Sequence, residues 1–363
     1  MTDFIMQMQP WFGEEEKKAI SNYMDEGGFI TEYEKTNKFE SLIKEYTKAK
    51  HCIVVNNGTV SLTLAALASG IKSGDDVIVP NYTMIATPNS VKFFGANPIF
   101  VDVDPVTFCL DIDLVKKAIT SKTKAVILVT SNGRYPVSGI KPFEVLCKEK
   151  NLILIEDSAQ SLGSFYPDGR HMGTVGHVGS FSFSAPKIIS TGQGGAVITN
   201  NDEIALKLRK LKDFGRTEGG NDIHDTLGYN FKFTELQAVI GIEQIKKLPS
   251  RVKRKKEIKK MYQSLLKSKA GINLIEQDLT HTTPWFIDAI AEDRSNLQVR
   301  LKENNIGSRV MYPPINKQKV YDIEEEHKIS NMIGLKGLWL PSSNQLTDEQ
   351  IFKICEVINN YYA

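Results

Sequence analysis

Two short segments carry side chains that could do chemistry together. The apolar run Leu152–Ile155 ends in Glu156 and Asp157, which puts a carboxylate at the mouth of a buried strand. A carboxylate in such a place keeps its negative charge only when a cation lies beside it. Lys187 follows alternating aromatic and hydroxyl residues and precedes a glycine-rich turn. A lysine in such a tight, partly dry setting has a lowered pKa and can form a Schiff base with an aldehyde.

A third segment, Asn56-Asn57-Gly58-Thr59, follows one predicted strand and opens a predicted helix. Backbone amides at a helix start, beside a threonine hydroxyl, suit a phosphate. Each signal has an ordinary alternative: a helix cap for Asp157, a surface position for Lys187 and a plain strand–helix turn for Gly58. Together the three segments match the ring nitrogen, aldehyde and phosphate of pyridoxal 5′-phosphate. The carboxylate would keep that nitrogen protonated, and the freed lysine amine would move protons.

Short apolar runs alternate with helical segments between residue 51 and about residue 200. Such alternation predicts an α/β fold with a mainly parallel sheet covered on both faces, and ligands bind beyond the carboxyl ends of its strands. The expected strands are His51–Val55, Val77–Pro80, Pro98–Val103, Ala125–Val129, Leu152–Glu156, Ser180–Ser184 and Ala196–Thr199.

The pattern changes after about residue 245. A basic helix, a strand near Trp285–Ile290, a helix Asn296–Asn305 and a C-terminal helix from Thr347 are expected there. We therefore predict a large cofactor domain in residues 1–245 and a smaller α+β domain in residues 246–363.

Composition excludes several other classes of protein. The chain has 363 residues, 41% of them hydrophobic, and a net charge of +2, so it is globular and has no general attraction to nucleic acid or to an anionic membrane. Arg251–Lys260 is strongly basic, yet it has no interleaved aromatic residues for base stacking, and we expect a solvated helix that links the domains. The four isolated cysteines indicate neither a metal site nor disulfides. No apolar run reaches membrane-spanning length, and a cytoplasmic protein is expected.

The chain resembles the DegT/DnrJ/StrS family of sugar-nucleotide aminotransferases over nearly its whole length. The resemblance implies the fold-type I architecture of pyridoxal-phosphate enzymes, which is aspartate aminotransferase-like. It is carried by the segments Gly27–Ile30, Asn57–Thr59, Val77–Pro80, Glu156–Gln160, Ser182–Gly195 and Gly228–Asn230.

The resemblance also implies roles for single residues. Lys187 would bind the cofactor aldehyde and Asp157 the ring nitrogen, with Gln160 beside the ring. Gly58, Thr59 and Ser182 would hold the phosphate. Asn230 would reach the cofactor phosphate of a neighbouring subunit, which implies a homodimer with shared active sites.

Within the family, Lys187–Gly192 and the Tyr312-Pro313 segment look most like the branch of GDP-perosamine synthases. Enzymes of that branch move an amino group from L-glutamate to C4 of a GDP-linked 4-keto-6-deoxy sugar. Lys187 favours this reaction over the dehydration performed by family members that carry histidine in its place. Three alternatives stay open: amination at C3, a UDP- or dTDP-linked keto-sugar, and a catalytically silent regulator.

The chain departs from the family pattern mainly where a sugar would bind. Met84 stands where an aromatic residue usually covers the ring, with Tyr82 close by; Gln193 replaces a glutamate; Ile315 and Asn316 stand where a histidine is common; and Asn132–Pro136 also differs. Tyr82, Arg309 and Tyr312 are the candidate substrate residues, with Arg216 as an alternative to Arg309.

Overall fold

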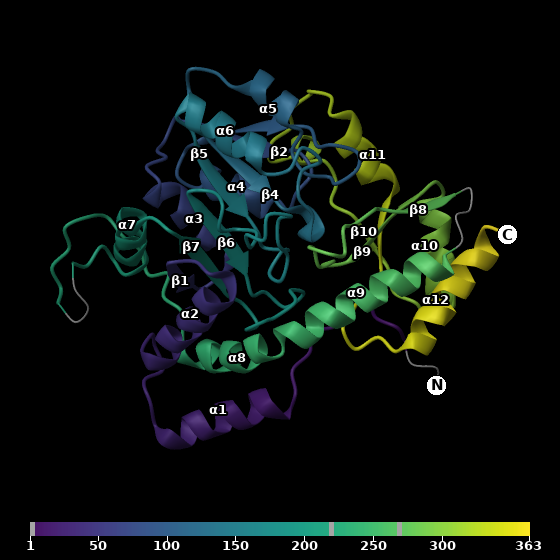
Figure 1. Cartoon of the computed structure of the whole chain (residues 1–363), viewed down its shortest axis with the longest axis horizontal. Coiled ribbons are helices and arrows are strands. Elements are labelled where there is room, and N and C mark those ends of the chain that lie inside the picture. Colours follow the sequence, from purple (N-terminus) through teal and green to yellow (C-terminus); the bar gives the residue numbers. More distant parts are fainter. Residues whose placement is uncertain (1–3, 218–220, 267–270) are drawn as a thin grey trace.

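The computed structural model of the chain describes residues 4–217, 221–266 and 271–363. Within these ranges the largest sheet has seven strands in the order β1-β7-β6-β5-β4-β2-β3 (Figure 1). β7 runs antiparallel to β1 and β6, and the other neighbours are parallel. The strands are β1 (His51–Val55), β2 (Asp76–Pro80), β3 (Asn97–Val101), β4 (Thr123–Val129), β5 (Ile153–Asp157), β6 (Val178–Ser182) and β7 (Gly195–Thr199).

The mainly parallel sheet predicted from the sequence is confirmed, and every predicted strand of it is present with its ends within two residues of those expected. Alternate residues of a strand face opposite sides of the sheet. In β1, Ile53 and Val55 join the core beneath α3, whereas Cys52 and Val54 join the core on the other face. The helices of this part are α1 (Glu14–Glu26), α2 (Glu34–Thr47), α3 (Gly58–Ala68), α4 (Ala86–Lys92), α5 (Ile112–Ala118), η1 (Ser131–Gly133), α6 (Lys141–Lys150), α7 (Asp202–Lys212) and α8 (Glu235–Lys246).

A second, antiparallel sheet follows in the order β10-β11-β9-β8. Its core also takes in Ile5, whose amide donates a hydrogen bond to the carbonyl of Asn305. The N-terminal segment is thereby attached to the C-terminal part of the chain. The elements here are α9 (Leu248–Leu265), β8 (Ile272–Leu274), β9 (Ile287–Ala291), α10 (Arg294–Glu303), β10 (Arg309–Val310), η2 (Ile315–Lys317), α11 (Lys328–Lys336), β11 (Gly337–Leu340) and α12 (Asp348–Tyr361).

Helix α9 runs from α8, beside the large sheet, to α12 beside the small one (Figure 1). The prediction that Arg251–Lys260 is a solvated helix is wrong for one face. Arg251, Lys255 and Lys259 are only 3%, 2% and 1% exposed, because residues four apart lie on the same side of a helix. Lys253 and Lys260 do face solvent. Composition counts charges, but it does not tell which side of a helix is packed.

Candidate active site

Most of the predicted site residues line one cavity of about 670 Å³. It lies beyond the carboxyl ends of β1, β5 and β6, where an α/β sheet is expected to bind its ligand. The predicted residues found there are Gly58, Thr59, Met84, Asp157, Gln160, Ser182, Lys187, Arg309 and Tyr312. The lining also contains residues that were not predicted, namely Asn56, Asn57, Thr83, Ser184, Gln193 and Trp285.

Lys187 lies in the turn after β6. Its backbone amide donates to the carbonyl of Ser184 at 3.0 Å, and its Nζ lies 4.0 Å from the centre of the Trp285 ring. The side chain reaches the cavity but is mostly surrounded by protein. This desolvation lowers the pKa of Lys187 to about 8, against the attraction of Asp157, and Arg309 lowers it further. A large share of the amine is therefore unprotonated, and hence nucleophilic, in mildly alkaline solution.

Asp157 is the last residue of β5 and is buried. Its Oδ2 accepts a hydrogen bond of 2.7 Å from the Thr87 hydroxyl, and its Oδ1 accepts one of 3.2 Å from the Ala159 amide. Burial raises the pKa of Asp157, while these hydrogen bonds and the charge of Lys187 lower it. A cationic ring nitrogen placed here would stabilise the carboxylate. Thr87 was not predicted from the sequence, because it reaches Asp157 only through the packing of α4.

The N-terminus of α3 forms an anion cradle. Gly58 is the first residue of the helix, and the Asn57 side chain accepts a hydrogen bond of 2.9 Å from the Val60 amide. The first turn of a helix leaves amide groups for a ligand. Ser182 lies so close that a Cβ on Gly58 would approach the Ser182 Cβ to 2.8 Å, so only glycine fits. Cradle, carboxylate and amine thus fit the three polar groups of pyridoxal phosphate.

Trp285 is a site residue that the sequence did not reveal. Its indole Nε1 donates a hydrogen bond of 2.7 Å to the carbonyl of Pro186, the residue before Lys187. Trp285 lies just before β9 of the second sheet, far from Lys187 along the chain, and stacks on Phe286. A tryptophan in a predicted strand is ordinarily a core residue, and no local signal distinguishes this one.

Three predicted contacts lie outside the cavity lining. Tyr82 is buried and packs edge-on against Phe108, with ring centres 5.7 Å apart. Its ring is 6.1 Å from that of Tyr312, so it supports a cavity residue from behind. Arg216 pairs with Asp213 and Asp222. The third residue, Asn230, lies on the surface.

Two of the departures from the family pattern make internal contacts. The side-chain amide of Asn316 is buried. It accepts a hydrogen bond of 2.9 Å from the Asn81 side chain and donates one of 3.1 Å to the carbonyl of Ile323. Asn132 exchanges two hydrogen bonds, of 2.9 and 2.6 Å, with the backbone of Phe286, and its own amide donates to Gln160 Oε1 at 2.6 Å. Asn132 thus joins the turn after β4 to the segment before β9, and its backbone amide holds Gln160 at the cavity.

Asn230 is held at the outer edge of the large sheet. The carbonyl of Tyr229 accepts a hydrogen bond of 2.9 Å from the Phe214 amide. The amide of Phe231 donates to Lys212 at 3.0 Å, and its carbonyl accepts one of 3.2 Å from the Asn56 amide. The segment that carries Asn230 is therefore fastened to α7 and to the cavity loop after β1.

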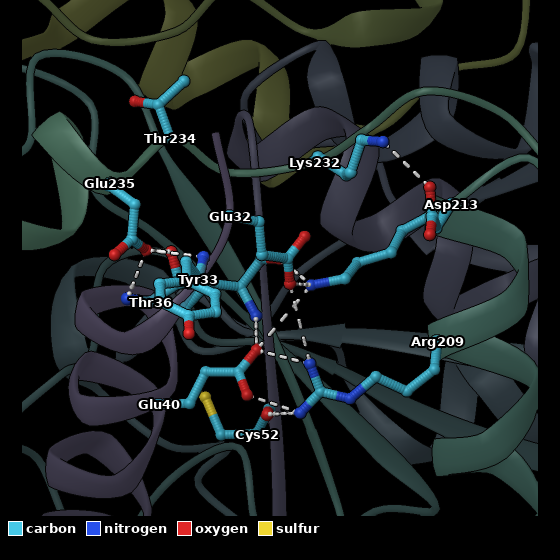
Figure 2. Close-up of polar contacts among 12 residues, drawn as sticks. Glu32, Tyr33, Thr36, Glu40, Cys52, Arg209, Asp213, Lys232, Thr234 and Glu235 are labelled. Atoms are coloured by element: carbon cyan, nitrogen blue, oxygen red, sulfur yellow. Dashed lines mark hydrogen bonds and ion pairs between the residues drawn. The ribbon is translucent and has the colours of Figure 1, made fainter. Parts of the chain in front are cut away.

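A cluster of charged side chains covers the free edge of β1 (Figure 2). We call Glu32, Glu40, Arg209 and Lys212 the edge cluster. Glu40 accepts a hydrogen bond of 2.9 Å from the Val54 amide; Arg209 donates to the carbonyl of Cys52, and Lys212 to that of Val54, both at 3.1 Å. The same cations pair with the acids: Arg209 with Glu40, and Lys212 with Glu32. Strand groups that another chain could bind are thus occupied.

Among the described residues, the helices are too short or too polar to cross a membrane. The same residues contain no group of three or more His, Cys, Asp or Glu side chains that could hold a metal ion. The four cysteines are free and buried.

The chain belongs to the DegT/DnrJ/EryC1/StrS aminotransferase family, whose sequence profile matches residues 10–359. It is 34% identical to a GDP-perosamine synthase of Escherichia coli O157:H7 over 99% of both chains, and 34% identical to one of Vibrio cholerae over 98% of both. Its fold matches DesV of S. venezuelae, solved in complex with a ketimine intermediate, with a TM-score of 0.90 and 29% identity over 96% of this chain and 94% of that one. The family, the fold class, the cofactor and the enzyme class inferred from the sequence are confirmed: this is a pyridoxal-phosphate-dependent sugar aminotransferase.

Proposed function

We propose that this enzyme moves an amino group from L-glutamate to the C4 keto group of a GDP-linked 4-keto-6-deoxy sugar. One observation carries the proposal: a single cavity gathers Lys187, Asp157 and the anion cradle at Gly58. The sugar is suggested by relatives named GDP-perosamine synthase that match the chain over almost its full length.

The residues of the cavity divide the work. Bound pyridoxal phosphate supplies an electron sink for the carbanion formed at the substrate. Asp157 would hold the proton on the ring nitrogen, and Gly58, Thr59 and Ser182 would hold the phosphate. Lys187 Nζ would hold the aldehyde and, as the base, would move the proton of the α-carbon of glutamate.

We propose that Met84 and Gln160 flank the cofactor ring, where a thioether can cover a π face. Arg309 and Tyr312 line the cavity on the side of the second sheet. A guanidinium there suits the carboxylate of glutamate or the diphosphate of the sugar nucleotide. Tyr82 supports Tyr312 from behind.

We further propose that two copies of the chain share their active sites. Asn230 lies on the surface and is firmly anchored, as a residue that completes the phosphate site of a partner must be. The surface also carries large exposed apolar side chains, among them Phe29, Ile30 and Leu227. Exposed side chains of this kind would be covered in a dimer. The buried free cysteines fit a reducing compartment, the cytoplasm, and residues 246–363 form the smaller of two domains.

The test is a two-step reaction followed by absorbance. We expect L-glutamate alone to abolish the absorbance of bound pyridoxal phosphate and to release 2-oxoglutarate. A panel of GDP-, UDP- and dTDP-linked keto-sugars should then restore it, fastest with a GDP-linked 4-keto sugar, and NMR of the product locates the amine at C4 or C3. No response to glutamate would contradict the proposed donor. Equal rates for all sugars would contradict the proposed acceptor.

A further inference from the structure

The buried face of α9 contacts the segment that carries Lys187. Arg251, Lys255 and Lys259, which we call the α9 stripe, all donate hydrogen bonds to oxygen atoms of the backbone. In the described parts of the chain, the three cations make no ion pair with a carboxylate within 4.0 Å. Burying a cation without an acid is costly. The positions of the accepting carbonyls show what this arrangement achieves.

Arg251 holds the chain directly after Lys187. Its guanidinium donates to the carbonyl of Ile188 at 2.9 Å and to the side-chain oxygen of Gln244 at 2.6 Å. That same Gln244 oxygen accepts a hydrogen bond of 3.1 Å from the Ser190 amide. The backbone on the C-terminal side of Lys187 is therefore attached to α8 and α9.

Lys255 acts on the other side of Lys187, through Trp285. Its Nζ donates to the carbonyl of Trp285 at 2.7 Å and also to that of Ser342. The Trp285 indole donates in turn to the carbonyl of Pro186 at 2.7 Å, and the ring lies under the Lys187 amine. The backbone on the N-terminal side of Lys187 is thus attached to the same helix, one turn further along.

We propose that Arg251 and Lys255 are positioning residues, which hold the carbonyl groups on both sides of Lys187 so that its amine points at the cofactor aldehyde. Arg251 does so directly, and Lys255 does so through Trp285. This inference rests on the role of Lys187 in the proposed function. Reacting groups must be held to within a fraction of an ångström, and misplacement by about 1 Å costs up to about a hundredfold in rate.

Lys259 offers an internal control for this role. It lies on the same face of the same helix, is as deeply buried as Lys255, and donates a hydrogen bond of 2.7 Å to the carbonyl of Ile275. Ile275 precedes β9 by several residues and does not line the cavity. Loss of Lys259 should therefore reproduce the structural cost of losing Lys255, but not its effect on Lys187.

The experiment compares Lys255→Met with Lys259→Met in protein freed of cofactor. Pyridoxal phosphate is added, the bond to Lys187 is trapped with borohydride at set times, and the modified peptide is quantified by mass spectrometry. We expect the rate of attachment to fall about ten- to a hundredfold in Lys255→Met and to stay at the wild-type value in Lys259→Met. Lys255→Arg, which keeps donors for both carbonyls, should restore the rate. Equal rates in both methionine variants would overturn the proposal.

A second background separates placement of the lysine from damage to the cavity. In Lys187→Ala the cofactor binds only through the remaining contacts, and its affinity is measured by equilibrium dialysis. Because Arg251 and Lys255 are proposed to act on Lys187 and not on the cofactor, we expect Lys255→Met to leave this affinity unchanged. A similar loss of affinity with and without Lys187 would show that Lys255 shapes the cavity as a whole, and would reject the positioning role.

Trp285→Phe keeps the test decisive if Lys255→Met fails to fold. It preserves an aromatic ring and removes only the N–H donor to Pro186, and we expect several-fold slower attachment. Wild-type rates in this variant, with attachment at Lys187 intact, would overturn the positioning role and leave the proposed function standing. If the wild-type protein itself does not attach pyridoxal phosphate at Lys187, the proposed function fails, and this inference falls with it.

Discussion

The edge cluster on β1 and the α9 stripe both attach cationic side chains to backbone carbonyls, but the cations differ in their other partners. Arg209 and Lys212 face carboxylates, whereas Arg251 and Lys255 face uncharged oxygen atoms. Burial lowers the pKa of Arg209, but Glu40 outweighs it and raises the pKa above the ordinary value. Burial and, to a smaller extent, the charge of Arg251 together lower the pKa of Lys255 to about 7.

The edge cluster and the α9 stripe therefore support the same cavity in different ways. The edge cluster holds β1, whose end leads into the anion cradle, by side chains that are themselves joined in ion pairs. The α9 stripe holds the segment of Lys187 by directional bonds to single carbonyls. Ion pairs fix a framework, and hydrogen bonds to chosen carbonyls set the direction of a reacting group.

The largest expected effect concerns Asp157, which belongs to neither the edge cluster nor the α9 stripe. Asp157→Asn removes the partner of the ring nitrogen, and we expect the rate of the glutamate half-reaction to fall about 100- to 1000-fold, as for loss of a strong electrostatic contact. Glu156→Gln is the matched control. The adjacent carboxylate is also buried, but it accepts hydrogen bonds from Tyr166 and the amide of Gly173. It should lose stability and keep its rate when folded. Near-normal turnover in Asp157→Asn would refute the assigned role.

The next effect tests the edge cluster. Lys212→Met leaves Glu32 without its close partner in a mostly buried site, and we expect the free energy of unfolding to fall by about 3 kcal/mol. Urea denaturation measures it. Lys210→Met breaks the more exposed pair with Asp225 and should cost about 0.5 kcal/mol. Similar losses in the two variants would mean that the edge cluster is no stronger than a surface pair.

The pH dependence of Lys187 comes third. Only the unprotonated amine attacks an aldehyde, and the pKa of Lys187 is about 8. We expect the rate of cofactor attachment to level off above pH 8 and to fall about tenfold per pH unit below it. Stopped-flow absorbance between pH 6 and 10 measures this profile. A rate that kept rising to pH 10 would place the pKa at the ordinary value for lysine.

The smallest effect sharpens the comparison itself. Because the pKa of Lys255 falls from 10.5 to about 7 on folding, the unfolded chain binds more protons between these values. The stability that the folded site gains from a neutral Lys255 is present at high pH and is lost as pH falls toward 7. Unfolding free energy should therefore rise with pH more steeply in the wild type than in Lys255→Met, by up to about 1 kcal/mol per unit.

The edge cluster supplies the reference for that measurement. Arg209→Met should differ from the wild type by a constant amount between pH 7 and 10, because the pKa of Arg209 is raised above its ordinary value and lies above this range. Denaturation curves at three pH values are enough. The distinction between the edge cluster and the α9 stripe would be wrong if the loss of unfolding free energy depended on pH in Arg209→Met, or if it were constant in Lys255→Met.

The parts of the site that the sequence predicted are those with a local pattern. Gly58 opens a helix after a strand, Asp157 ends an apolar run, and Lys187 stands before a glycine-rich turn. Each of these residues can therefore be predicted from its neighbours in the sequence. The alternating strands and helices likewise predicted the large sheet. The helices before residue 51, α1 and α2, were not predicted, since their apolar faces are short and pack mainly on α8.

The residues that were missed owe their roles to distant parts of the chain. Thr87 reaches Asp157 from α4, and Trp285 comes from the segment before β9. Arg251 and Lys255 were recognised as basic, but their burial depends on what packs against α9. Asn132 looked like a departure at the sugar site, yet it binds the backbone of Phe286. No spacing rule encodes such contacts.

The pairing of β1 with β7 also governs when the site can form during synthesis. His51 lies opposite Thr199, so β1 has no neighbour in the sheet until the ribosome has passed that residue. Contacts so distant along the chain form late, and growing chains meanwhile expose apolar surface. A nascent chain that stops before Arg251 holds Asp157 and Lys187, but none of the residues proposed to position Lys187. Fast attachment of the cofactor at Lys187 is therefore expected only once the chain has been made through Trp285.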